Sequence, residues 1–139
     1  MNIPILNPST AGARPLKVLV AEDNIINQRL VLNMLHALGH TGVVVGDGEK
    51  ALKCLAQLQF DVVLMDVMMP VMDGVQAVQA IRLQEADSGV HLPVVMATAH
   101  SEPGEAARFK LAGADGYLAK PIEIGQLAAE LQRVTALYP

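Results

Sequence analysis

Five polar side chains stand where apolar runs of the sequence end, and their types suit charge chemistry. Glu22 and Asp23 follow the first run, Asp66 the third, Thr98 the fourth and Lys120 the fifth. Two carboxylates about 4 Å apart repel each other by roughly 4 kcal/mol at an effective dielectric of about 20, so three gathered carboxylates need cations. One divalent cation and the lysine together balance three acids. A site lined by oxygen atoms favours Mg²⁺, with Mn²⁺ or Ca²⁺ as substitutes.

A carboxylate beside Mg²⁺, a hydroxyl and a lysine suits phosphoryl transfer, because that reaction depends on positioning and on neutralising charge on the phosphoryl oxygens. A carboxylate can itself be the nucleophile and form an acyl phosphate. The metal, Thr98 and Lys120 would then each take one phosphoryl oxygen, and Asp66 is the expected acceptor. Taken singly, such an acid more often caps a helix, as Asp23 would for a helix beginning at Asn24. The whole set is difficult to attribute to capping.

These polar residues would meet if the apolar runs are strands of one sheet. The runs are short, rich in β-branched residues and not alternating, which is typical of strands buried on both faces. The expected strands cover residues 16–21, 41–45, 60–65, 93–97 and 116–119.

Segments with a helical period separate these runs. Asp47 and Asp73 are the expected N-caps of the second and third segments, and Gly113 ends the fourth. Strand and helix alternate five times, which predicts an α/β fold with a doubly wound, five-stranded parallel sheet and five helices. Ligands bind such sheets at the carboxyl ends of the strands. The expected inward stripes are Ile26, Leu30, Met34, Leu35 and Leu38 in the first segment and Ile124, Leu127, Leu131 and Val134 in the fifth.

The composition limits the function classes. The chain has 139 residues, of which 52% are hydrophobic, enough for the core of one domain. Its formal net charge is −4, whereas proteins that bind nucleic acid directly usually carry a basic patch, so nucleic acid is not an expected direct partner. A single cysteine, Cys54, excludes an internal disulfide and suits the cytoplasm. No apolar run reaches the roughly 20 residues of a membrane-spanning helix.

Residues 1–15 differ in composition from the rest of the sequence. Residues 1–15 contain three prolines without periodicity, which predicts a flexible tail or linker, and residues 16–139 are expected to form the domain.

The histidines have unrelated spacings and are expected to be solvated surface or loop groups rather than metal ligands. They are His36, His40, His91 and His100.

Four motifs resemble the receiver domain of two-component response regulators. They are VAEDN at 20–24, LMDVMMPVMDG at 64–74, PVVMATA at 93–99 and GADGYLAKP at 113–121. The resemblance covers about residues 16 to 136. It implies a flavodoxin-like sheet with strand order 2-1-3-4-5, the order of a chemotaxis receiver that is a standard example of this architecture.

The resemblance also implies roles for the site residues. Asp66 matches the phosphorylated aspartate, and Glu22 and Asp23 match the acidic pair that holds Mg²⁺. Met68 matches the position whose backbone carbonyl is a further metal ligand. The cofactor expected on this basis is Mg²⁺.

A second group of residues matches the switch of the family. Thr98 matches the hydroxyl that turns toward the phosphoryl group, and Lys120 matches the lysine that pairs with it. Tyr117 matches the aromatic residue that changes rotamer. Pro121 stands where the family usually has a cis peptide bond.

The expected function is therefore a phosphorelay receiver, a signalling module rather than an enzyme. Its expected partner is a sensor histidine kinase or a histidine phosphotransfer protein, and dimerisation on phosphorylation is a further expectation. The string AEDNIINQ resembles receivers attached to hybrid sensor kinases, which would make residues 1–15 a linker from a kinase core. No DNA-binding or catalytic segment is expected after Val134, so output would be protein contact or onward transfer.

Two alternatives remain open on the sequence. An aspartate-nucleophile phosphatase of the haloacid dehalogenase type would need a second Asp two residues after Asp66, where this chain has Met68. A degenerate receiver that only binds partners would not need Thr98 and Lys120. His100, two residues after Thr98, is not an obvious holder of an attacking water, and neither is Met68, so we expect slow spontaneous hydrolysis of the acyl phosphate.

Overall fold

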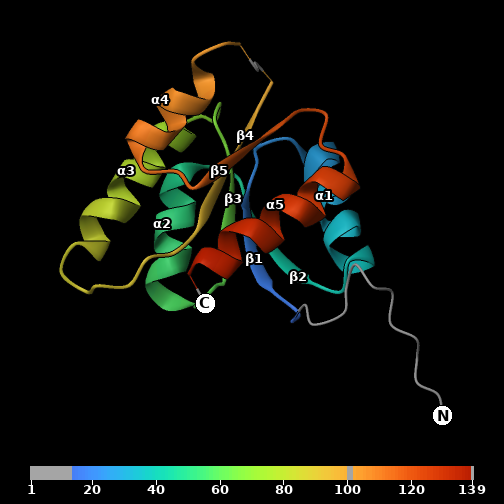
Figure 1. The fold of residues 1–139 in the computed structure, drawn as a ribbon, viewed down its shortest axis with the longest axis horizontal. Helices are drawn as coiled ribbons and strands as arrows, with labels where there is room; N and C mark the ends of the chain where they lie inside the picture. Colours follow the sequence, from blue (N-terminus) through green and yellow to red (C-terminus); the bar gives the residue numbers. More distant parts are fainter. Residues whose placement is uncertain (1–13, 100–101, 139) are drawn as a thin grey trace.

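The computed structural model of the chain describes residues 14–99 and 102–138, and within these ranges five strands alternate with five helices (Figure 1). The strands are β1 (Lys17–Ala21), β2 (Thr41–Val45), β3 (Val62–Asp66), β4 (Val94–Thr98) and β5 (Gly116–Ala119). The helices are α1 (Ile25–Ala37), α2 (Gly48–Gln57), α3 (Gly74–Glu85), α4 (Glu105–Ala112) and α5 (Ile124–Leu137). The predicted alternation and α/β class are confirmed.

All neighbouring strands run parallel, in the order β2-β1-β3-β4-β5. Leu19 at the middle of β1 pairs with Val43 of β2 on one side and with Val63 of β3 on the other, so the three strands are aligned at this level. Every residue of the central strand β3 is buried. The order confirms the predicted flavodoxin-like sheet, and it places the carboxyl ends of all strands at one edge.

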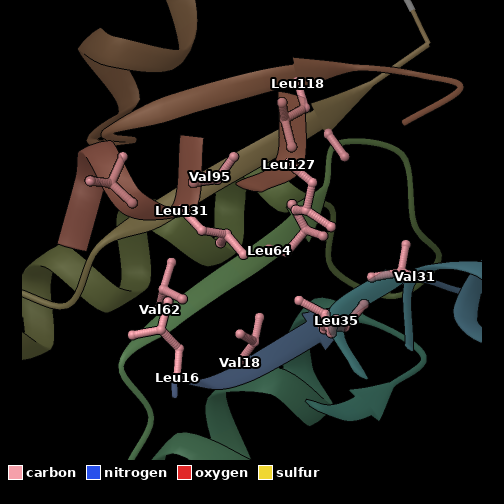
Figure 2. Packing of buried hydrophobic residues seen from close by; sticks show 13 residues of the cluster. Leu16, Val18, Val31, Leu35, Val62, Leu64, Val95, Leu118, Leu127 and Leu131 are labelled. Carbon is pink, nitrogen blue, oxygen red and sulfur yellow. The ribbon is translucent and has the colours of Figure 1, made fainter. Parts of the chain in front are cut away.

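Helices cover both faces of this sheet, with α1 and α5 on one side and α2, α3 and α4 on the other (Figure 1). The faces alternate along each strand, as the pleat requires. On β1, Val18 and Val20 face α1 and α5, whereas Leu19 and Ala21 face the opposite helices. Two hydrophobic cores result, one on each face of the sheet, and Figure 2 shows the core beneath α1 and α5. Its fully buried side chains include Leu35, Leu64, Leu127 and Leu131.

Side chains at the helix starts explain where the helices begin. Asp47 and Asp73 cap α2 and α3, as predicted. The start of α1 differs from the expectation, because its N-cap is Asn24, whose Oδ1 accepts a hydrogen bond from the Asn27 N–H at 3.0 Å. Asp23 is therefore not a helix cap, and the capping alternative for this acid is wrong.

The inward stripe of α1 also differs from the expectation. Val31 and Leu35 are buried, whereas Ile26 is 70% exposed and Leu30 is 51% exposed. Ile26 is in the first turn of α1, next to the carboxyl end of β1, and neither it nor Leu30 in the following turn reaches the core. The stripe of α5 was predicted more closely, with only Ile124 outside the core.

Two expectations fall on residues that the structure does not describe. The predicted tail lies outside the described residues up to residue 13, and His100 lies outside them as well. Within the described ranges, no helix has both the length and the apolar character needed to cross a bilayer.

Candidate functional site

Three predicted site residues are buried at the carboxyl edge of the sheet. Asp66 ends the central strand β3, Glu22 follows the neighbouring strand β1, and Thr98 ends β4. Their exposed fractions are 6%, 5% and 2%. Burying such polar groups is unfavourable unless partners replace the lost water. Burying two acids and a hydroxyl at one edge of the sheet is therefore favourable only if they have partners there, such as a cation or a bound ligand.

Lys120 lies between the two buried carboxylates. Its Nζ is 2.8 Å from Glu22 Oε1 and 2.9 Å from Asp66 Oδ2, which are distances of charge-assisted hydrogen bonds. Its backbone N–H donates to Thr98 O at 2.8 Å and so continues the pairing of β5 with β4. The peptide bond between Lys120 and Pro121 is cis, as the resemblance implied.

Three acids gather at the same point. Glu22, Asp23 and Asp66 each bring a carboxylate oxygen within 4.8 Å of the others, and no other such group of three potential ligands occurs among the described residues. Asp23 is exposed at the rim, whereas the other two are buried. One lysine leaves this cluster with surplus negative charge. Hard carboxylate oxygens at this spacing fit Mg²⁺.

The electrostatics of the site follow from burial and pairing. Burial raises the pKa of Asp66, and the Glu22 carboxylate adds to the rise against the opposing effect of Lys120. Burial alone would raise the pKa of Glu22 as well, but hydrogen bonds from Lys120 and from the Asn24 N–H outweigh burial and lower it. Burial opposes the charge of Lys120, yet the two carboxylates raise its pKa. Burial and the neighbouring Glu22 carboxylate therefore disfavour the charged form of Asp66.

The backbone after Asp66 turns tightly and fixes the end of β3. The Met68 N–H faces Asp66 Oδ1 at 3.4 Å, and the Gly74 N–H donates to Val67 O at 2.9 Å. A Cβ at Gly74 would collide with the Asp66 carbonyl oxygen, so this close approach requires glycine. Val71 in the same loop has φ 67°, a left-handed conformation that is costly for a β-branched residue.

The predicted switch residues lie at different depths. Thr98 is buried one strand away from Asp66, at the end of β4. Tyr117 on β5 is 38% exposed, and its ring lies 6.2 Å from the buried ring of Phe109 on α4, so it packs beside α4 rather than within the acid cluster. The switching roles of both residues stay predictions, and so does the Met68 carbonyl as a metal ligand.

Two contacts to Glu22 were not predicted from the sequence. The Asn24 N–H donates to Glu22 Oε2 at 3.0 Å, and Gln28 Nε2 donates to Glu22 O at 2.6 Å. Gln28 is four residues after the N-cap Asn24, so both residues lie on the face of α1 that looks back to the end of β1. Only the Gln28 contact uses a side chain, because Asn24 donates through its backbone N–H, so the residue types after the acidic pair gave no clear signal.

Two histidines have partners, contrary to the expectation that all four are solvated. His40 Nδ1 accepts a hydrogen bond from the Leu16 N–H at 3.0 Å. His91 Nε2 is 2.8 Å from Asp115 Oδ1, and its ring stacks on Tyr138 with centroids 4.0 Å apart. Both lie near the amino edge of the sheet, away from the acid cluster.

Comparison with known proteins gives a consistent result. The model of the response regulator receiver domain family matches residues 18–132. The chain is 42% identical over 127 residues to the sensor protein GacS of Pseudomonas syringae pv. syringae, which covers 91% of the chain and 14% of that protein. It is 40% identical over 113 residues to the hybrid signal transduction histidine kinase I of Dictyostelium discoideum, which covers 78% of the chain and 6% of that protein.

A solved structure is similar over nearly its whole length. The receiver domain of a sensor histidine kinase from Pseudomonas aeruginosa, crystallised with a magnesium ion in its active-site cleft, has a TM-score of 0.78 and 34% identity, covering 88% of this chain and 99% of that one. The chain spans about a seventh or less of the two sequence relatives named above. The family match over most of the chain shows that it belongs to the response regulator receiver domains of two-component signalling.

Proposed function

We propose that this receiver accepts a phosphoryl group on Asp66 from a phosphohistidine of a partner protein. The main support is the placement of Asp66, a buried carboxylate at the end of the central strand that is bonded to Lys120 and close to two further acids. Such a carboxylate can act as a nucleophile. The partner is a histidine kinase or a histidine phosphotransfer protein.

The transfer requires little covalent chemistry from the protein beyond the acceptor. A carboxylate oxygen of Asp66 attacks the phosphorus, the bond from phosphorus to the partner's imidazole nitrogen breaks, and its electron pair stays on that nitrogen. Lys120, held 2.9 Å from Asp66 Oδ2, supplies positive charge beside the phosphoryl oxygens. The Thr98 hydroxyl donates to one of these oxygens.

The acids beside Asp66 would hold the metal. Glu22, Asp23 and Asp66, together with the Met68 carbonyl, would bind Mg²⁺, which when bound neutralises charge shared by the carboxylates and the phosphoryl group. Burial and, to a smaller extent, the Glu22 carboxylate raise the pKa of Asp66, so a bound cation would favour its charged form.

Phosphorylation then changes the balance between two conformations. Contacts from the phosphoryl group to Thr98 and Lys120 exist in one state only, so they favour that state. Tyr117 relays the difference to the surface beside α4, where it is partly exposed. The output is contact with another protein, including a second copy of this chain, or onward transfer of the phosphoryl group.

The wider setting is part of the same proposal. Residues 16–139 form the receiver unit, residues 1–15 form a linker, and the chain acts in the cytoplasm as a signalling module rather than as a turnover enzyme. The relatives named as a sensor protein and as a hybrid histidine kinase support a hybrid kinase as the parent protein.

Incubation with Mg²⁺ and a small-molecule phosphodonor tests the function. Intact-mass spectrometry should show one phosphoryl adduct per chain that depends on Mg²⁺ and is absent from Asp66→Asn. Steady release of many equivalents of phosphate would instead indicate a phosphatase of the haloacid dehalogenase type. A chain without any adduct would be a binding module that is not phosphorylated.

A further inference from the structure

We propose that Gln28 is a positioning residue that sets the affinity of the acid cluster for Mg²⁺. Gln28 lies in the second turn of α1, and its Nε2 donates to the backbone carbonyl of Glu22 at 2.6 Å, a short hydrogen bond. The inference rests on the proposed function, because it concerns the cation site that this function needs.

Four hydrogen bonds hold Glu22, and each acts on a different part of the residue. Its N–H donates to Val45 O at 3.0 Å, Oε1 accepts from Lys120 at 2.8 Å, and Oε2 accepts from the Asn24 N–H at 3.0 Å. Gln28 alone among these partners acts on the carbonyl. That carbonyl belongs to the peptide unit that joins Glu22 to the next residue, so Gln28 controls the direction of this unit.

The direction of this peptide unit places the second acid of the pair. A peptide is planar, so fixing its carbonyl also fixes the N–H and the Cα of the following residue, here Asp23. Asp23 is exposed, which means that core packing does not hold its carboxylate beside Glu22 and Asp66. Ligand atoms must be held in place for tight metal binding, and residues that orient the ligands contribute strongly to affinity. Gln28 supplies this orientation from outside the acid cluster.

Substitutions at Gln28 separate positioning from charge. Gln28→Ala removes the donor without adding charge. Gln28→Glu keeps the length of the side chain, replaces the donor with an acceptor facing the Glu22 carbonyl, and adds a negative charge near the cation site. A purely electrostatic role predicts tighter Mg²⁺ binding by Gln28→Glu, whereas a positioning role predicts weaker binding.

Asn27 provides a matched control. It is the neighbouring amide residue of the same helix, and its hydrogen bond to the Asn24 cap uses the backbone N–H, which alanine keeps. Mg²⁺ affinity is measured by isothermal titration calorimetry on the whole chain. We expect Gln28→Ala and Gln28→Glu to weaken Mg²⁺ binding about 10-fold, the lower end of effects seen for residues that orient metal ligands. Asn27→Ala should bind Mg²⁺ as the parent does.

Thermal unfolding and phosphorylation at saturating Mg²⁺ distinguish a weaker cation site from a damaged fold or a lost acceptor. Thermal unfolding without Mg²⁺ should change little in Gln28→Ala, and phosphorylation by a small phosphodonor should recover at saturating Mg²⁺, because the acceptor is intact. Equal Mg²⁺ affinity in the parent and Gln28→Ala, or tighter binding by Gln28→Glu, would overturn the positioning role while leaving Asp66 as the acceptor. A parent chain that neither binds Mg²⁺ nor forms an adduct would overturn the proposed function itself.

Discussion

The receiver contains two clusters of charged side chains at opposite edges of its sheet, and they are built differently. At the amino edge, the Arg82 guanidinium donates to Glu85, to Asp115 and to the carbonyls of Leu92 and Gly113, at 2.7 to 2.9 Å. At the carboxyl edge, three acids share a single lysine. The amino-edge cluster has two acids and an arginine that donates to both, whereas the carboxyl-edge cluster has three acids and one lysine.

This difference separates a structural ion pair from a functional site. Asp115 accepts from Arg82 and from the Val94 N–H, and His91 contacts its other oxygen, so its charge needs no further partner. Asp66 has a raised pKa because burial and a neighbouring acid oppose its charge. Acids are seldom fully buried unless they are paired, and the useful observation is a buried acid whose charge is disfavoured by burial and by a neighbouring carboxylate. The predictions below test this contrast.

Removal of the Arg82 guanidinium should give the largest effect on stability. Arg82→Ala removes the cation that Glu85 and Asp115 share and the hydrogen bonds that it donates to them, which costs about 3 kcal/mol in the free energy of unfolding because these charged groups are only partly exposed. Urea denaturation measures this loss, and Mg²⁺ should not restore it. Arg108→Ala is the control, because Arg108 is half exposed and its pair with Glu105 is worth little. Similar losses in the two variants would remove the contrast between the clusters.

The same substitution in the two clusters should have opposite signs. Without Mg²⁺, Asp115→Asn lowers the free energy of unfolding by about 3 kcal/mol, because it weakens hydrogen bonds to a charged group. Asp66→Asn raises the free energy of unfolding by of order 1 kcal/mol, since the raised pKa means that the folded chain disfavours the charged form of Asp66. Chemical denaturation at neutral pH compares both variants with the parent, and destabilisation by both would contradict the assignment.

The amino edge should respond to acid through His40. Burial lowers the pKa of His40 below its ordinary value of 6.5, and its Nδ1 must be unprotonated to accept from the Leu16 N–H. A lowered pKa contributes stability that is present above the ordinary value and is lost as the pH falls through the pKa of the folded state. We expect a loss of about 1 kcal/mol between roughly pH 7 and pH 5. His40→Asn, which keeps an acceptor, should flatten this slope in denaturation curves, and an unchanged slope would exclude His40 as its source.

The smallest effect concerns strain beside the acid cluster. Val71 is the non-glycine residue with a positive φ among the described residues, and it lies in the loop that follows Asp66. Asparagine tolerates this conformation better than valine, so Val71→Asn should raise the free energy of unfolding by up to about 1 kcal/mol. Val90→Asn, at a similarly exposed valine, should leave the melting temperature nearly unchanged. No gain from Val71→Asn would mean that the loop is not strained.

The fold and the meeting of the acids with Lys120 could be predicted because both depend on local patterns. Short β-branched runs between helical segments leave little choice but a parallel sheet, and such a sheet brings its carboxyl ends together. Glu22, Asp66 and Lys120 follow three of these runs directly, so their meeting needed no knowledge of side-chain orientation.

What could not be predicted depends on tertiary contacts between side chains. The predicted inward stripe of α1 included Leu35 correctly, but it also took in Ile26 and Leu30, which are exposed, and left out Val31, which is buried. The Arg82 cluster joins α3, the start of β4 and the start of β5, and no local spacing in the sequence marks it. The bond from Gln28 to Glu22 depends on a rotamer, which a pattern of residue types does not specify.

The pairing of Lys120 with Glu22 has a consequence for the synthesis of the protein. The two residues are separated by 98 positions along the chain, and the lysine directly follows β5, the last strand in the sequence. A nascent chain that has already formed its first four strands still lacks this cation at the acid cluster. On the proposed function, the site that takes up a phosphoryl group is complete only once Lys120 has been translated, so a nascent chain gains this competence late in its synthesis.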